Sequence, residues 1–166
     1  MGFAEERLTK MRRKDREITD AKKIEEIIAG ARYMHLGLFD GEHPYVVPLH
    51  YGYKMEDGKL TFYMHCAKEG HKIDCLRANN NVFVEIDRGE SLIYADQPCA
   101  FGAEYVSVMC RGKAIILDDG AEKTEALINL MKIQTGQDYE INEKMAAVVN
   151  VIKVDIESYT AKACTR

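Results

Sequence analysis

The sequence predicts a mainly β domain, in which about six antiparallel strands form a small barrel with helices packed on its outside. Short segments with alternating apolar and polar residues run through much of the 166-residue chain. Asp-Gly pairs at Asp40-Gly41 and Asp57-Gly58 separate the first of these segments, as in β-hairpins. A closed or partly closed barrel is favoured over a sandwich because it leaves fewer strand edges unpaired. The length fits one domain, covering residues 1–166.

The first half of the chain predicts one helix and three strands. Asp20 precedes a stripe of isoleucines spaced three and four residues apart, and Gly30 follows it, which predicts a short capped helix. The next segments alternate, and we expect them to form an antiparallel meander. These strands cover residues 33–39, 45–53 and 60–65.

The second half predicts further helices and three more strands. Residues 69–78 lack alternation and indicate a short helix, which Asn79 and its neighbours end. Asp119 and Glu122 resemble a capping pair and predict a helix that closes near Gly136. The strands cover residues 82–86, 105–117 with a bulge at Gly112, and 150–156.

Composition excludes several classes of function. The 23 Lys and Arg residues against 27 Asp and Glu residues give a net charge of -4, so bulk charge predicts no nucleic-acid binding. Residues 7–16 are an exception, because they carry six positive charges and one negative charge. They lie in an N-terminal basic arm, residues 1–18, which is either a solvated segment or a contact for an anion. No apolar run is long enough to span a membrane, and residues 1–8 lack the apolar stretch of a signal peptide, so we expect a cytoplasmic protein.

The cysteines and histidines do not predict a metal site. The five cysteines are an odd number without CxxC spacing, and we expect reduced, mainly buried thiols. The five histidines contain no i,i+4 helical pair, and His35 is expected to pack or form a hydrogen bond on its strand.

Two features could bind a ligand. Pro48 interrupts a predicted strand, which therefore lies at an edge or bulge, where neighbouring backbone groups are free for a ligand. The segment 65–72 (HCAKEGHK) leads from a strand end into a helix start, where unpaired N–H groups favour anions. His71 and Lys72 add cationic side chains there, which suits either a bound phosphate or a solvated surface.

Several blocks together resemble the nitroimidazole-resistance (Nim) proteins, which belong to the pyridoxamine 5'-phosphate oxidase-like flavin-binding split barrels. The blocks occur in order and are joined by a similar closing strand at 151–162. They are 11–18 (MRRKDREI), 45–49 (YVVPL), 65–74 (HCAKEGHKID), 105–108 (YVSV) and 112–114 (GKA).

The resemblance implies a six-stranded Greek-key split barrel that forms a homodimer, with FMN bound in a cleft at the subunit interface. The second strand would line the flavin ring, the end of the third strand and the next helix would hold the ribityl phosphate, and Ser107 would add a polar contact. The implied cofactor-binding residues are Val46, Val47, Pro48, Leu49, His50, Met64, His65, His71, Lys72 and Ser107.

Departures from the pattern narrow the expected activity. Pyridoxamine phosphate oxidases proper carry an Arg-Lys pair where this chain has His71-Lys72, and their C-terminal Trp has no counterpart in a chain with no Trp. We therefore expect an FMN-dependent oxidoreductase that reduces small aromatic or nitroimidazole-type substrates, with His71 or His50 as the candidate catalytic residue. The alternatives are a split barrel that holds haem or deazaflavin, one that binds flavin without turnover, and an arm that recruits an acidic partner or nucleic acid.

Overall fold

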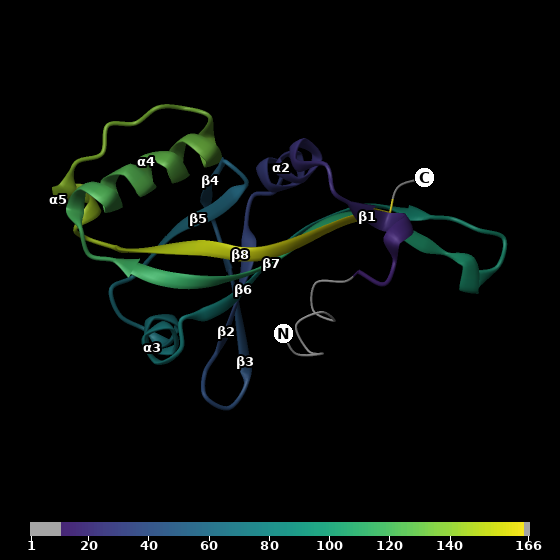
Figure 1. Ribbon diagram of the computed structural model, residues 1–166, viewed down its shortest axis with the longest axis horizontal. Coiled ribbons are helices and arrows are strands. Elements are labelled where there is room, and N and C mark those ends of the chain that lie inside the picture. Colours follow the sequence, from purple (N-terminus) through teal and green to yellow (C-terminus); the bar gives the residue numbers. More distant parts are fainter. Residues whose placement is uncertain (1–10, 165–166) are drawn as a thin grey trace.

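The computed structural model describes residues 11–164 and shows a strongly twisted antiparallel sheet with helices around it (Figure 1). The strands are β1 (Glu17–Ile18), β2 (Met34–Phe39), β3 (Pro44–Leu49), β4 (Gly52–Glu56), β5 (Lys59–Cys66), β6 (Asn81–Ile93), β7 (Gly102–Leu117) and β8 (Asn150–Cys164). The helices are α2 (Ala21–Gly30), α3 (His71–Ala78), α4 (Gly120–Thr135) and α5 (Glu143–Ala146), with 3-10 turns η1 (Lys14–Arg16) and η2 (Pro98–Ala100).

The sheet topology is that of a split barrel. The strand order is β3-β2-β6-β7-β8-β5-β4, and β1 pairs with β8. The two end strands, β3 and β4, are nevertheless consecutive in sequence and are joined only by His50 and Tyr51. The chain therefore crosses directly from one edge of the sheet to the other, which brings the edges together at this point without hydrogen-bonding them.

This crossing corrects the predicted strand 45–53 and the meander built on it. β3 pairs with β2, whereas β4 pairs with β5. The division has a tertiary cause: the Tyr51 hydroxyl donates to the carbonyl oxygen of Ile28 at 2.5 Å, and Gln134 Nε2 donates to the Tyr51 carbonyl at 2.7 Å. The backbone of Tyr51 is thus bonded to α4 instead of a neighbouring strand, which divides one expected strand into two. With the short strand β1 added, the described sheet has eight strands where six were expected.

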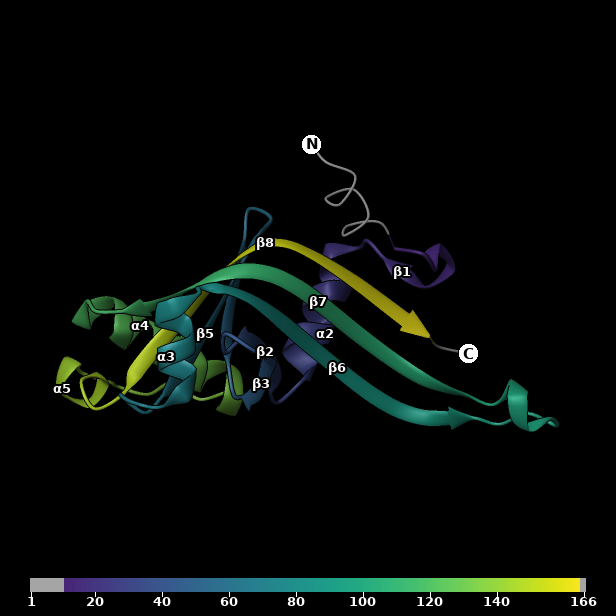
Figure 2. The same ribbon diagram turned by 90° about the horizontal axis from the view of Figure 1, so that it is seen from below.

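The long strands exceed the predicted lengths. β6 and β7 continue beyond the barrel as a two-stranded arm with η2 near its tip (Figure 2). β8 runs beside β7 as far as the pair of Tyr105 with Cys164. The short strand β1 was not predicted, and it lies in the basic arm, of which residues 1–10 are outside the described part of the chain. Arg16 of the basic arm donates a hydrogen bond from Nη1 to the hydroxyl of Tyr105 in β7 at 3.1 Å.

The barrel interior is filled with side chains, as predicted. Phe62, Met34 and Val108 are fully buried in one cluster, against which α2 packs its isoleucine stripe. A second cluster lies on the outer side of the sheet, where α4 and α5 cover Leu117 and Val151. Ligands of appreciable size must therefore bind outside the barrel.

The local signals for helix ends and turns are largely confirmed. The side chains of Asp20 and Asp119 accept the backbone N–H groups of Lys23 and Glu122, and Gly136 ends α4 in the left-handed conformation. Asn79 ends α3 in an extended conformation with φ of -150°, so the left-handed asparagine is not used there.

The bulge predicted at Gly112 is present, but the extra residue is Glu157 of β8. Arg111 pairs with Ser158 and Gly112 pairs with Ile156, which leaves Glu157 without a partner in β7. All five cysteines are free thiols, although Cys99 is exposed. Within residues 11–164, no helix has both the length and the apolar character needed to cross a membrane.

Candidate functional site

β3 provides an open strand edge, as its proline predicts. It is the end strand of the sheet, and Pro48 pairs with His35 of β2. A proline at an edge strand loses no hydrogen bond of the ladder. Val46 and Pro48 are exposed on the outer face, whereas the side chains of Val47 and Leu49 pack against the core. Of the predicted flavin-lining side chains, only alternate ones therefore face the outside.

The start of α3 lies on the strand-to-helix connection that was predicted to hold an anion. Gly70 precedes the helix with φ of 130° and, within the described residues, no side chain caps it. By contrast, Asp20, Asp119 and Asn142 cap the other three α-helices. The first N–H groups of α3 thus lack the side-chain acceptor that a helix start ordinarily has.

His71 connects α3 to β3. Its ring centroid lies 4.8 Å from that of Tyr45. Its Nε2 lies 3.8 Å from Asp40 Oδ2 and 3.6 Å from Cys75 Sγ. The pKa of Asp40 is lowered mainly by backbone N–H groups of His43 and Glu42, with a smaller contribution from His71. An ionised carboxylate therefore lies close to the His71 ring.

Lys72 and the end of β5 form the other side of this region. Lys72 is half-buried, and His65 is exposed. Burial raises the pKa of the Cys66 thiol, and the charge of Lys72 opposes that rise, which places the ammonium near the end of β5. Met64 is 0% exposed and belongs to the barrel core, so only its backbone can reach a ligand.

His50 lies at the opposite end of β3 from Tyr45 and His71. Five residues of strand separate Tyr45 from His50, which is about 16 Å. The two candidate catalytic histidines are therefore not brought together, and they cannot act on the same atom within one chain.

The hydrogen-bond partners of His50 define the tautomer of its neutral ring. Its Nδ1 lies 3.0 Å from the Arg32 carbonyl oxygen and 3.1 Å from Gln134 Oε1. Because Gln134 Nε2 donates to the Tyr51 carbonyl, its Oε1 faces His50 as an acceptor. Both partners are acceptors, so Nδ1 carries the proton, and Nε2 is the nitrogen left to exchange a proton with a ligand.

Ser107 lies on the outer face of β7, separated from β3 by β2 and β6. Three strand spacings correspond to about 14 Å. Ser107 is only 5% exposed, and its Oγ has no hydrogen-bond partner among the described residues. Its cross-strand neighbours are Asp87 and Lys162. The predicted cofactor contacts thus lie on three separate parts of the surface.

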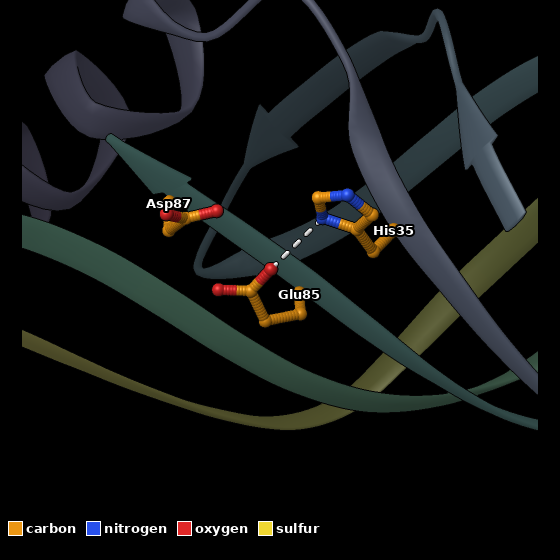
Figure 3. A group of neighbouring side chains, drawn as sticks. All are labelled: His35, Glu85 and Asp87. Carbon is orange, nitrogen blue, oxygen red and sulfur yellow. Dashed lines mark hydrogen bonds and ion pairs between the residues drawn. The ribbon is translucent and has the colours of Figure 1, made fainter. Parts of the chain in front are cut away.

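A polar cluster that the sequence did not reveal occupies the same outer face. His35 Nδ1 lies 3.1 Å from Glu85 Oε2, and Asp87 points toward the same space (Figure 3). Burial and, to a smaller extent, Asp87 raise the pKa of Glu85, whereas His35 opposes this rise. The outward direction of His35 follows from the alternation of β2, but its pairing with Glu85 spans 50 residues and leaves no local signal.

An apolar groove of about 530 Å³ lies beside this cluster, between β3 and the bulge. Leu38, Phe39 and Val46 line one side of it. Arg111 and Glu157 provide charged groups at its other side. Its volume falls in the range of small-molecule sites, and its wall includes one of the predicted cofactor residues, Val46.

Comparison with known proteins identifies the family. The family model described as pyridoxamine 5'-phosphate oxidase matches residues 20–163. No curated protein matches this sequence. A candidate 5-nitroimidazole antibiotic resistance protein from Bacteroides thetaiotaomicron VPI-5482 is 36% identical with a TM-score of 0.77, over 89% of this chain and 86% of that one.

Two further solved structures share the fold. The FAD and heme binding protein from Mycobacterium smegmatis has a TM-score of 0.77 at 14% identity, over 91% of this chain and 74% of that one. An FAD-binding protein from Mesorhizobium loti has a TM-score of 0.65 at 22% identity, over 90% of this chain and 98% of that one. Since the family model covers nearly the whole chain, this protein belongs to the pyridoxamine 5'-phosphate oxidase family.

Proposed function

We propose that this protein binds FMN along the open edge of β3 and uses it to reduce small aromatic or nitroimidazole-type substrates. The observation that carries the proposal is the uncapped start of α3, with His71 and Lys72 in its first turn, beside an edge strand. Family membership, the 36% identity to a candidate nitroimidazole-resistance protein and two structural neighbours that bind FAD support it.

The start of α3 fits a phosphate group by its donors. Its free N–H groups lie at the positive end of the helix dipole. Lys72 adds a full charge, and the His71 ring, 3.8 Å from Asp40, can add an N–H donor. A Cβ on Gly70 would meet no atom within 4 Å, so the approach to these N–H groups is open.

The remaining predicted residues would contact the ring portion of the cofactor. The free backbone edge of β3 can hydrogen-bond to the polar edge of a flavin, and Val46 and Pro48 offer apolar contact. Bound FMN supplies hydride transfer, which no amino-acid side chain can provide. His50, with Nε2 available, is the residue that would transfer a proton to a substrate near the far end of β3.

A second copy of the chain would complete the site. The filled barrel leaves only outer surfaces for the ligand, and burying most of a flavin requires a second surface. The outer face carries exposed Phe39, Val46 and Phe83, at 45%, 56% and 38% exposure. We therefore propose a homodimer with FMN at the subunit interface, located in the cytoplasm.

The first experiment tests the cofactor. The visible spectrum and chromatography of the released chromophore distinguish FMN, FAD and haem in freshly purified protein. Flavin bands that a reductant bleaches support the proposal. A Soret band without flavin would favour the alternative, a haem-binding split barrel, for which exposed His50, His65 and His71 offer ligands.

The second experiment tests the phosphate assignment by titrating FMN into flavin-free protein. Lys72→Ala removes a charged hydrogen bond worth about 1.5–3 kcal/mol, which corresponds to about 10- to 150-fold weaker FMN binding. Lys59→Ala makes the same change at the other end of β5 and should leave affinity unchanged. Equal affinities of the two variants would show that the phosphate lies elsewhere.

The third experiment tests turnover. Reduction of a 5-nitroimidazole by the FMN-loaded protein with NADH, NADPH or dithionite should be slower in His50→Gln at unchanged FMN content. Full flavin loading without any reduction of the substrate would instead indicate a flavin carrier.

A further inference from the structure

We propose that His35, Glu85 and Asp87 bind a divalent transition metal of the Zn²⁺ class on the outer face of the sheet. The three residues provide one imidazole nitrogen and two carboxylate oxygens, and these ligand atoms all lie within 4.8 Å of one another. Figure 3 shows the three side chains converging on one space above β2 and β6. The inference uses residues outside the start of α3 and does not depend on flavin binding.

The sheet itself positions the three ligands. His35 and Glu85 are direct cross-strand partners in the register of β2 and β6. Asp87 follows Glu85 by two residues, so its side chain emerges on the same face of the same strand. Edge-to-face contact with Tyr33, at 5.9 Å between ring centroids, holds the His35 ring. Two rigid strands thus carry the site, with no loop involved.

The spacing of the ligand atoms is suitable for a small ion. Zn²⁺ binds His nitrogen and carboxylate oxygen at about 2.0–2.2 Å, so ligand atoms around a tetrahedral ion lie about 3.4 Å apart. The side chains of Glu85 and Asp87 therefore need rotations that move their oxygens by about 1 Å. Three protein ligands leave a fourth position for water or for a substrate atom.

The charge of the cluster is suitable for a cation. Two carboxylates lie together, and His35 Nδ1 lies 3.1 Å from one of them, Glu85 Oε2. Of the basic residues on this face, Lys162 and Arg16 lie over the ring of Tyr105 at 5.5 Å and 5.9 Å from its centroid, and Arg111 lies at the groove. A divalent cation would balance both carboxylates.

Ser107 provides an independent indication. It lies directly opposite Asp87 in the register of β6 and β7 and is 5% exposed. Its Oγ has no partner among the described residues. A buried hydroxyl ordinarily has a hydrogen-bond partner, because leaving it without one costs about 1–3 kcal/mol. An Asp87 carboxylate turned toward the metal would accept this hydrogen bond, and Ser107 would then be the kind of outer-shell partner that metal-bound carboxylates commonly have.

The ligand types select the metal. Imidazole nitrogen favours Zn²⁺ and neighbouring first-row ions, whereas Mg²⁺ and Ca²⁺ prefer sites made only of oxygen. We expect Zn²⁺ and Co²⁺ to bind and Mg²⁺ and Ca²⁺ not to compete with them.

The test is calorimetric titration of ZnCl₂ into tag-free full-length protein, with Co²⁺ absorption as a second measurement. We expect one Zn²⁺ per chain. His35→Ala and the nearly isosteric Asp87→Asn should weaken binding at least about 10- to 100-fold, the range known for loss of an outer-shell partner alone. Both variants should lose the visible Co²⁺ bands, and His43→Ala, which removes an exposed histidine outside the cluster, should change neither result.

The outcomes are decisive. Unchanged Zn²⁺ affinity in Asp87→Asn and His35→Ala, or equal losses in His43→Ala, would overturn the proposal. The absence of any Zn²⁺ binding by the parent protein would also overturn it. Circular dichroism of each variant checks folding, and flavin content, measured in parallel, separates this result from failure of the proposed flavin site.

Discussion

The bulge between β7 and β8 allows one substitution to be predicted quantitatively. A Cβ on Gly112 would lie 2.4 Å from the carbonyl oxygen of Asp155, about 1 Å short of ordinary contact. This neighbour is backbone in a hydrogen-bonded ladder and cannot rotate away, so Gly112→Ala must push the two strands apart. Such overpacking costs about 1–3 kcal/mol, and the reduced entropy of the unfolded chain offsets about 0.4–1 kcal/mol.

We therefore expect Gly112→Ala to destabilise the protein by about 1.3 kcal/mol. For a chain of this length, that loss lowers Tm by about 3–5 °C. Differential scanning calorimetry at one protein concentration and one cofactor state measures it, because Tm of an oligomer depends on both.

Gly89→Ala is the matched control. It makes the same chemical change in the neighbouring strand β6, where a Cβ meets no atom within 4 Å. Its Tm should change by less than about 2 °C, in keeping with a surface substitution. If the two variants melt within 2 °C of each other, the steric reasoning at Gly112 is wrong.

Three further predictions concern the core and the helix ends. Tyr51→Phe removes the hydroxyl that donates to the Ile28 carbonyl, and urea unfolding should show a loss of about 1–3 kcal/mol. Burial raises the pKa of Cys110 to about 12. Above about pH 9 the thiol of the unfolded chain ionises, whereas the thiol of the folded protein stays protonated. The free energy of unfolding should therefore fall by up to about 1.4 kcal/mol per pH unit between about pH 9 and 12. Between pH 8.5 and 10, urea unfolding should show a smaller fall in the free energy of unfolding for Cys110→Ala than for the parent protein, and an equal fall would contradict this account. In the folded protein at pH 8, a thiol reagent should label exposed Cys99 before buried Cys110. Asp119→Ala removes the N-cap of α4 and should cost about 1 kcal/mol by the same unfolding assay.

Much of the fold was predictable because its signals are local. The Asp57-Gly58 turn has φ of 50° and 76°, a conformation that glycine and asparagine-like residues adopt readily. The caps at Asp20 and Asp119 each act within three residues of the chain. The side-chain alternation of β2 likewise needs no information beyond the strand itself.

Strand lengths and pairings were less predictable because they depend on distant partners. The break between β3 and β4 is set by two hydrogen bonds of Tyr51: its hydroxyl donates to Ile28 of α2, 23 residues away, and its carbonyl accepts from Gln134 of α4, 83 residues away. The outer half of β6, residues 87–93, lacks an apolar face. It forms a strand because the neighbouring backbone of β7 completes its ladder, which the sequence pattern alone does not show.

The candidate site divides in the same way. The strand-to-helix segment that leads to His71 and Lys72 was predicted from sequence because its signal is local, and a helix start favours anions through its unpaired N–H groups. The sequence did not predict which of the candidate residues share one surface. His71 and His50 are separated along β3, Met64 is in the core, and the contact of His35 with Glu85 joins positions 50 residues apart.

The sequence by itself determined a mainly antiparallel barrel, its turns and caps, and a helix that begins near His71, since each follows from the conformational preferences of neighbouring residues. Only the tertiary structure decided where the barrel splits, that Ser107 is buried without a partner, and that one imidazole and two carboxylates meet on the outer face. These features arise from strand register, and register is fixed by packing and hydrogen bonds between segments far apart in the chain.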